Sequence, residues 1–277
     1  MSALKKILIK TKRQIFSEIS GNNASIFEGE GFDFVELREY SYGDDVRKID
    51  WNVTAKMQRP FIKIFKEERE LNIAVVSLLG GSVHFGSKRF KQELISEVVA
   101  LLSFSAVKNG DTFASYLYTD GVESVVQPTK NIHAVHKAVA AVIDFEALGK
   151  QVDGKGLAVT LYKEIKRRSI IFVIGDFFED FDFKLLSKKH EVVAIMIRDR
   201  FEENPPELGR VNLADPTSLG TSLMQIDKSA IKRYKEKVAK KDHAFYAHCR
   251  KNRVAFTKIY TDEEPFVKLS KLFLKRA

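Results

Sequence analysis

The feature that most constrains the fold is a regular alternation of strand-like and helix-like segments from Leu71 to the C-terminus. The strand-like segments are nearly continuous apolar runs, as in parallel strands that are covered on both faces. The segments between them have the apolar spacing of amphipathic helices. The alternation predicts an α/β fold with a doubly wound, mostly parallel sheet. The predicted strands are residues 72–79, 112–119, 122–127, 169–175, 192–198 and 253–260. The predicted helices are residues 88–108, 132–145, 157–167, 183–190, 229–252 and 263–275.

Two connections in this region stand out. Asp120-Gly121 joins two strand-like segments, and this dipeptide is a strong hairpin signal, so the second strand of the pair is predicted to be antiparallel. Residues 199–225 contain Pro205-Pro206 and Asp215-Pro216. They predict a long irregular connection of the kind that usually carries function or moves.

The N-terminal quarter has a different texture. Residues 2–19 predict a basic amphipathic helix, ended by residues 21–23, that packs on its own domain or on a partner. Weak contact with a membrane surface is the alternative. Residues 28–70 alternate charged and aromatic side chains and predict a small β-rich arm without a helix. The expected domains are residues 1–27, 28–70 and 71–277.

Composition narrows the function classes. The chain has 46 Lys and Arg residues against 37 Asp and Glu, a net charge of +9. A basic excess can attract nucleic acid or anionic surfaces, but the charge is spread along the chain and favours solvated helix faces. No nucleic-acid reader motif is present, so nucleic acid is not an expected partner. The densest basic stretches are residues 5–6, 166–168 and 232–241.

Other sequence features indicate a cytoplasmic protein without enzymatic activity. The single cysteine, Cys249, suits a reducing compartment. No signal peptide is expected, and no apolar run approaches the roughly 20 residues of a membrane span. The sequence has no P-loop, no nucleophile elbow and no paired metal-ligand histidines.

Three stretches carry a resemblance to a known family. The first runs from Gly29-Glu30-Gly31 to the Gly43-Asp44-Asp45 and Ile49-Asp50-Trp51 motifs. The second contains Ala55, Pro60 and the charged run 66–70, and the third joins Phe85-Gly86-Ser87 to Lys91. Over about residues 28–275 the chain resembles the domain of unknown function 58 family.

The resemblance implies a von Willebrand factor A-like domain in a bacterial protein, with no established enzymatic activity. Members of the family often accompany MoxR-type AAA+ ATPases. It therefore implies a protein partner, for which such an ATPase is the candidate, and a role in the assembly or maturation of other proteins.

The resemblance also implies where a metal site would lie. Von Willebrand A-type domains hold Mg²⁺ with Asp-x-Ser-x-Ser after the first strand, a Thr and a second Asp. In this sequence Leu78 takes the place of the Asp, Gly80 takes the place of the first Ser, and Lys155 falls near the position of the Thr. Ser82 and Asp176 are the remnants. The site is therefore expected to be degenerate and the protein to need no cofactor.

The fate of the remaining carboxylate is open at this point. One hypothesis places the Lys155 ammonium beside Asp176 in place of the metal, since an unpaired carboxylate at a partly buried site is costly. The other has both residues exposed in loops. An alternative function is a binding module that keeps weak Mg²⁺ affinity.

The arm concentrates charge and the only tryptophan. A catalytic role for the adjacent carboxylates Asp44 and Asp45 is disfavoured for two reasons. No nucleophile accompanies them, and adjacent residues in a strand point to opposite faces of the sheet. An ion network that locks the arm to the core and a docking surface for a partner remain. An exposed Trp51 would favour docking. The sequence thus predicts a protein–protein interaction scaffold, with nucleic-acid or anionic-surface binding as an alternative. The candidate partner-binding residues are Arg38, Asp44, Asp45, Arg47, Asp50 and Trp51.

Overall fold

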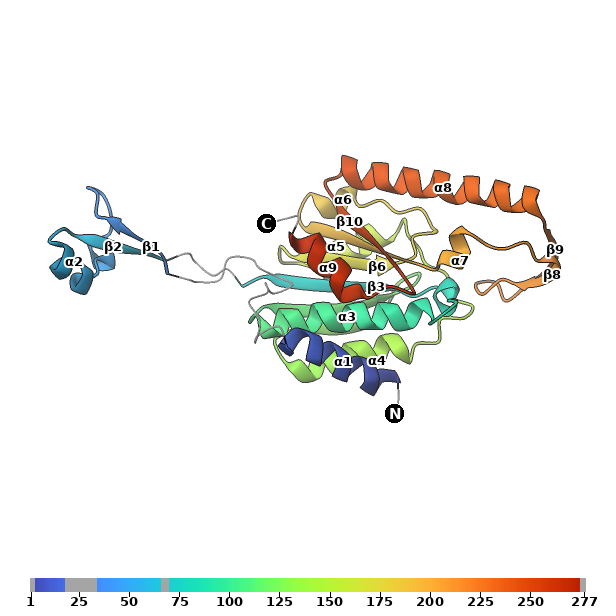
Figure 1. Ribbon diagram of the computed structural model, residues 1–277, viewed down its shortest axis with the longest axis horizontal. Helices are drawn as coiled ribbons and strands as arrows, with labels where there is room; N and C mark the ends of the chain where they lie inside the picture. The colour runs from blue at the N-terminus through green and yellow to red at the C-terminus, as the bar shows by residue number, and fades with distance from the viewer. Residues whose placement is uncertain (1–2, 18–33, 66–69, 275–277) are drawn as a thin grey trace. The chain divides into compact units, whose positions relative to one another are not determined.

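The computed structural model describes residues 3–17, 34–65 and 70–274. The chain forms two compact units. One contains Met1–Phe27 and Leu71–Arg276, and the other contains Glu28–Glu70. The ribbon in Figure 1 carries the element labels used below.

The larger unit is built on a six-stranded sheet with the order β10-β7-β6-β3-β4-β5. Neighbouring strands are parallel except β4 and β5, which pair antiparallel across Asp120-Gly121. The doubly wound, mostly parallel sheet and its one hairpin are confirmed. The strands are β3 (Asn72–Leu78), β4 (Thr112–Tyr118), β5 (Val122–Thr129), β6 (Ile170–Gly175), β7 (Glu191–Arg198) and β10 (Ala255–Tyr260).

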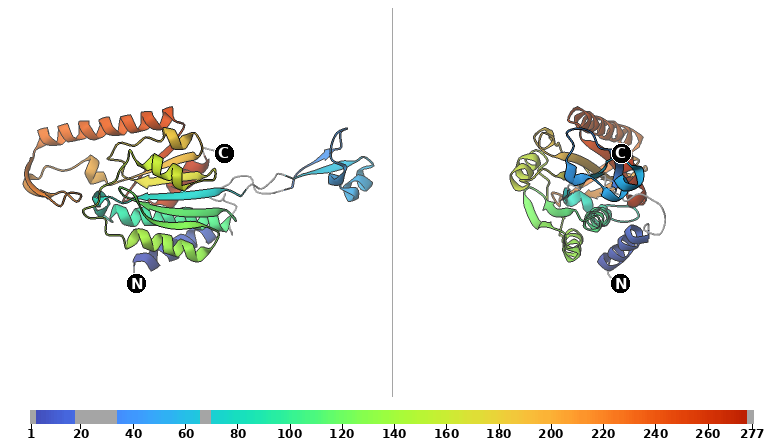
Figure 2. Two further views of the ribbon diagram at one scale, coloured as in Figure 1. Left: turned by 180° about the vertical axis from the view of Figure 1, so that it is seen from behind. Right: turned by 90° about the vertical axis from the view of Figure 1, so that its left-hand side faces the viewer.

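Helices cover both faces of this sheet (Figures 1 and 2). On one face, α3 (Lys91–Lys108) packs on the sheet between α4 (Ile132–Ile143), which contacts β5, and α9 (Pro265–Leu274), which contacts β10. The helix α1 (Ala3–Ser17) packs on α3 and α4. On the other face lie α5 (Leu157–Glu164), α6 (Lys184–Ser187) and α8 (Lys228–Lys251). Two apolar cores result, one on each side of the sheet.

The basic N-terminal helix packs on its own domain, the favoured reading of its pattern. Leu4, Ile7 and Leu8 of α1 lie against the core around α3. Lys10 of α1 pairs with Glu97 of α3 at 2.7 Å. The apolar side of α1 therefore packs against the core of the larger unit. Its expected end at residues 21–23 lies outside the described residues. In the described part of the chain, no helix has both the length and the apolar character needed to cross a membrane.

The prediction of an irregular connection over residues 199–225 is wrong. The segment contains the short helix α7 (Arg200–Glu203) and an antiparallel hairpin of β8 (Gly209–Ala214) and β9 (Thr221–Ile226). Asp215-Pro216 forms the tip of the hairpin, where the Asp215 carboxylate accepts from Thr217 N at 2.9 Å. These strands are largely exposed, so they lack the continuous apolar runs that marked the central strands.

The smaller unit, called the arm below, pairs β1 (Phe34–Glu39) with β2 (Phe61–Phe65). Between them lie a 3₁₀ turn (Val46–Lys48) and α2 (Trp51–Met57). The expectation that the arm lacks a helix is wrong. Asp50 supplies the missing start signal, because its carboxylate accepts from the backbone of Asn52 and Val53 as an N-cap.

Candidate functional site

The residues of the expected degenerate metal site meet at the carboxyl edge of the sheet. β3 ends at Leu78 and leads through Gly80 to a 3₁₀ turn (Gly81–His84), and the neighbouring β6 leads directly to Asp176. Because adjacent parallel strands end at the same edge, the two loops face each other. Ser82 Oγ donates to Asp176 Oδ2 at 2.5 Å. Leu78, Gly80, Ser82 and Asp176 line one cavity of about 200 Å³.

The cation beside Asp176 is Lys91, the first residue of α3. Its Nζ lies 3.1 Å from Asp176 Oδ2 and 2.5 Å from Oε1 of Glu202, a residue of α7. The Lys91 side chain is completely buried. Sequence reasoning noted Lys91 only as part of a family motif and missed Glu202. Their pairing depends on packing between segments far apart in the chain.

The hypothesis that Lys155 supplies this cation is corrected by the same contacts. Lys155 is exposed, and it lines a separate cavity of about 360 Å³ with Asp153, Glu179 and Asp180. The loop between α4 and α5 offers few residues on which to align the sequence, so the position of Lys155 could not be fixed from the sequence.

The pKa values of the two carboxyl groups that share Lys91 are shifted in opposite directions. Burial raises the pKa of Asp176, but the Lys91 charge and the Ser82 hydrogen bond outweigh it, so this pKa is lowered. Burial also raises the pKa of Glu202, and there it outweighs the Lys91 charge, so the net pKa is raised. Of the two groups, Asp176 therefore keeps its negative charge to lower pH.

A divalent metal does not fit these residues. Mg²⁺ needs near-octahedral oxygen coordination, whereas Leu78 and Gly80 offer no side-chain oxygen. Leu78 is 3% exposed and belongs to one of the apolar cores, so it is a packing residue. Of the oxygens that remain, those of Asp176 and Glu202 already accept from the Lys91 ammonium, and the Ser82 hydroxyl donates to Asp176.

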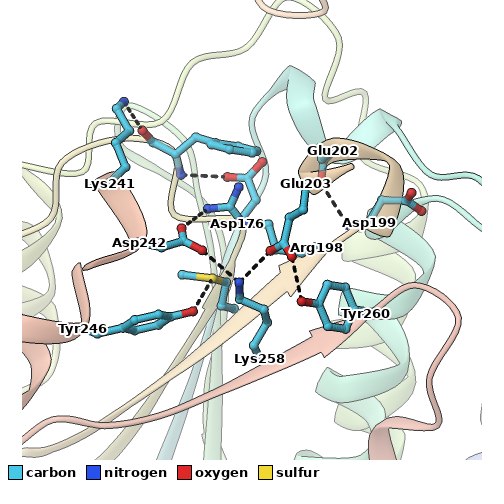
Figure 3. A network of polar contacts seen from close by, with 12 residues as sticks. Asp176, Arg198, Asp199, Glu202, Glu203, Lys241, Asp242, Tyr246, Lys258 and Tyr260 are labelled. Atoms are coloured by element: carbon cyan, nitrogen blue, oxygen red, sulfur yellow. Dashed lines mark hydrogen bonds and ion pairs between the residues drawn. The ribbon is translucent and has the colours of Figure 1, made fainter. Parts of the chain in front are cut away.

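A second ion network lies beside the first (Figure 3). Arg198, at the end of β7, donates from Nη2 to Asp242 Oδ1 at 2.8 Å. Lys258 of β10 joins Asp242 at 2.8 Å and Glu203 at 2.6 Å. Tyr260 donates its hydroxyl to Glu203 at 2.8 Å. The network ties α7, α8 and β10 to the sheet edge.

Burial and hydrogen bonding fix the charge states in this network. Burial would lower the pKa of Lys258, but its hydrogen bonds to Asp242 and Glu203 raise it on balance. Burial and the hydrogen bond to Glu203 raise the pKa of Tyr260 to about 12. Arg198 is fully buried with its Cζ 3.6 Å from the centroid of the Phe178 ring. Its Nε and Nη1 have no hydrogen-bond partner among the described residues.

Asp199 fastens a third set of segments. Its carboxylate accepts from Ser87 N at 2.8 Å, from Phe201 N at 2.8 Å and from the hydroxyl of Thr261. Burial raises the pKa of Asp199, but these hydrogen bonds outweigh it and lower the pKa. The pattern Asp199-Arg200-Phe201-Glu202 is a capping box, a sequence signal that could have located α7.

In the arm, the candidate carboxylates organise turns. Asp44 accepts from Arg38 Nη2 at 2.8 Å and from Ser41 N at 2.8 Å. Asp45 caps the 3₁₀ turn, and Asp50 caps α2. These contacts hold the arm's own turns in place, which is the bland role for Asp residues in such positions.

Arg47 and Trp51 are different, because they face solvent. The Arg47 side chain is 91% exposed, and Trp51 is 69% exposed. Tyr42, Val46 and Met57 are exposed apolar or aromatic side chains in the same unit. We call Tyr42, Val46, Trp51 and Met57 the arm patch.

The comparisons with known proteins cover both the arm and the sheet edge. The family model described as "Protein of unknown function DUF58" matches residues 36–244. The uncharacterized protein Mb1516 of Mycobacterium bovis is 26% identical over 226 residues, 78% of this chain and 71% of the relative. The uncharacterized protein Rv1480 of Mycobacterium tuberculosis matches with the same identity and coverage.

Solved structures also align with the chain. The conserved hypothetical protein BatB from Bacteroides thetaiotaomicron has a TM-score of 0.48 at 9% identity and covers 74% of this chain and 98% of its own. The SpRpn10 VWA domain has a TM-score of 0.37 at 11% identity, with 76% and 96% coverage.

Proposed function

Because the chain belongs to the family described as protein of unknown function DUF58 and is built on a doubly wound, mostly parallel sheet, we propose that it is a non-enzymatic protein–protein interaction scaffold. In this proposal the arm patch is the contact surface for the partner. The fold alone does not define a function, so the proposal depends on the site.

The exposed Trp51 carries the proposal. Tryptophan is among the residues most enriched at interface hot spots, and exposed apolar side chains that gather in one patch mark interaction sites. Asp44 and Asp50 fix the turns around Trp51 through hydrogen bonds to the backbone. A surface held in this way loses little conformational entropy on binding.

The partner we propose is a MoxR-type AAA+ ATPase that works with this protein in the assembly or maturation of other proteins. The family resemblance supports this choice. The proposal places the protein in the cytosol, where an unpaired thiol such as Cys249 suits the reducing medium.

A binding experiment tests the arm patch. The full chain is immobilised, and the MoxR-type ATPase encoded in the same genome is titrated onto it. Trp51→Ala is expected to weaken binding by about 2 kcal/mol, roughly thirtyfold in Kd. Tyr162→Ala, which removes an exposed aromatic side chain from α5, is the matched control and should bind like wild type. Equal affinity of the Trp51 variant and wild type rules out the arm patch as the contact.

A second candidate function is binding to an anionic surface through the first part of α8. Residues 228–241 carry seven Lys and Arg side chains and one acidic residue, Glu236. All seven basic side chains are exposed, and α8 lies on the outside of the larger unit (Figure 2). Basic residues near an anionic bilayer contribute about 1 kcal/mol each.

Cosedimentation with vesicles tests this candidate. Phosphatidylglycerol vesicles should bind the chain at low salt, and phosphatidylcholine vesicles should not. Lys232→Glu with Lys237→Glu should weaken binding about tenfold or more. Lys166→Glu with Arg167→Glu makes the same charge change in another exposed basic stretch and serves as the control. An equal loss in both double variants means that net charge, not α8, drives the binding.

A further inference from the structure

The Lys91 ammonium is enclosed at the carboxyl edge of the sheet. The lysine side chain is 0% exposed, and its two partners, Asp176 and Glu202, are 14% and 12% exposed. The aromatic ring of Phe178 lies 5.3 Å from Nζ and adds a cation–π contact. A buried lysine is costly unless anions pair with it, and here two carboxylates do so.

The Lys91 ammonium lies at the residues of the expected metal site. It contacts the carboxylate of Asp176, and Ser82 Oγ donates to the same oxygen, Asp176 Oδ2. Ser82 and Asp176 are the two residues that match the metal ligands of von Willebrand A-type domains. The ammonium therefore lies among the oxygens that would otherwise be available to a metal ion.

We propose that Lys91 is a built-in cation that replaces the divalent metal at this edge, so that removal of its ammonium converts Ser82, Asp176 and Glu202 into a divalent metal site. The inference is independent of the arm patch and of any partner. Lys91 belongs to α3, Asp176 to the loop after β6 and Glu202 to α7. One side chain thus joins three segments at the edge without any ion from solution.

The charges of the three side chains support the replacement. One ammonium faces two carboxylates, so a divalent cation would balance their charge if the lysine were absent. Two carboxylates and a hydroxyl are the oxygen ligands that Mg²⁺ and Mn²⁺ prefer, and water can complete the shell. While Lys91 is in place, its positive charge opposes a second cation at the same oxygens.

Calorimetric titration with Mn²⁺ and Mg²⁺, with thermal unfolding in metal or EDTA, tests the proposal on the full chain. Wild type should show no binding heat and no chelator effect. Lys91→Ala should bind Mn²⁺ at least about tenfold more tightly than wild type. It should also melt at a lower temperature than wild type and regain stability when Mn²⁺ is added.

Three further variants separate the proposal from its rivals. Lys91→Arg keeps the positive charge and should not gain metal binding. Lys155→Ala, which removes the exposed lysine of the neighbouring loop, should behave like wild type. Lys91→Ala with Asp176→Asn should lose the gained Mn²⁺ affinity, because it removes a ligand.

The outcomes are decisive even when the variant folds poorly. If Lys91→Ala is insoluble, its refolding yield is measured with and without Mn²⁺, and a metal-dependent increase supports the proposal. Micromolar metal binding by wild type, no gain in Lys91→Ala, or no rescue of refolding by Mn²⁺ each overturns it. A gain of metal binding in Lys155→Ala instead assigns the cation role to Lys155 and also overturns it.

Discussion

At the scale of single residues, the carboxyl edge depends on buried charges that have specific partners. Arg198 and Lys258 both pair with Asp242, whose side chain is 11% exposed. Buried ions are costly to desolvate, so a pair contributes little net stability, whereas removal of one partner leaves an uncompensated charge. Removal of one partner is therefore expected to destabilise the protein more than replacement of the whole pair by apolar residues.

Asp242→Ala is expected to lower the free energy of unfolding by about 3–5 kcal/mol, because it leaves the buried Arg198 without its carboxylate and removes one of the two partners of Lys258. Urea unfolding followed by circular dichroism measures the change. Glu207→Ala removes an exposed carboxylate that pairs with Lys228 at 3.8 Å and should cost less than about 1 kcal/mol. Similar losses in both variants would mean that leaving a buried charge without its partner carries no special cost.

His190 predicts a dependence of stability on pH. Its side chain is buried, neither ring nitrogen has a hydrogen-bond partner among the described residues, and burial and Lys189 lower its pKa. Below the unfolded pKa of about 6.5, the unfolded chain gains a proton that the folded chain does not bind. Stability should therefore fall as the pH drops below about 6.5, by up to about 1.4 kcal/mol per pH unit from this group.

His190→Phe should flatten this dependence between about pH 6.5 and 5, because the variant has no ring to protonate. Urea midpoints at several pH values give the slope for each protein. His243→Phe, at an exposed histidine of α8, is the control and should keep the wild-type slope. If His190→Phe also keeps that slope, another group causes the acid sensitivity.

At the scale of elements, caps decide where the short helices begin. α2 has seven residues and no buried side chain, so packing contributes little to its stability. Helices of this length are marginal in isolation. The Asp50 cap is therefore a large part of what holds α2 together, and Trp51 is its first residue.

Asp50→Ala is expected to destabilise α2 by about 0.5–2 kcal/mol, because Asn52 N and Val53 N lose their acceptor. Native-state hydrogen exchange should show faster exchange in residues 51–57 and unchanged protection in α3. Lys56→Ala, at an exposed position of the same helix, should leave the exchange unchanged. Unchanged protection in Asp50→Ala would mean that the cap does not stabilise α2.

At the scale of the whole molecule, α3 is the centre of the larger unit. Fifteen of its 18 residues are buried, because the sheet and the helices α1, α4 and α9 all pack against it. The arm is a separate compact unit. A loss of packing around α3 should therefore affect the larger unit and spare the surface of the arm.

Leu101→Ala should lower the free energy of unfolding of the larger unit by about 2–5 kcal/mol, since Leu101 is fully buried in the core. Urea unfolding followed by circular dichroism measures it. Binding of the ATPase through the arm patch should remain within twofold of wild type under native conditions, on the order of 0.4 kcal/mol. Leu219→Ala, at a 63% exposed leucine of the hairpin tip, controls for a general Leu→Ala effect.

Much of the fold was predictable because its signals are local. Continuous apolar runs marked the six central strands, and Asp120-Gly121 marked their one antiparallel pair. Two local elements were missed. The helix that Asp50 caps lies within a charged and aromatic stretch that resembled a strand pattern. The β8–β9 hairpin lies near prolines, which indicated an irregular connection. At the candidate site, the family resemblance assigned Ser82 and Asp176 to one metal site, and they do meet, because the adjacent parallel strands β3 and β6 end at one edge.

By itself, then, the sequence determined the sheet and its helical layers, and it showed that Leu78 and Gly80 offer no side-chain oxygen around the end of the first of these strands. Only the tertiary structure decided which cation pairs with Asp176 and whether Trp51 is exposed. Lys91 lies 85 residues before Asp176 and 111 residues before Glu202 in the chain. Periodicity acts over a few residues, whereas an ion pair needs two side chains at one point in space, and that depends on how all the layers pack.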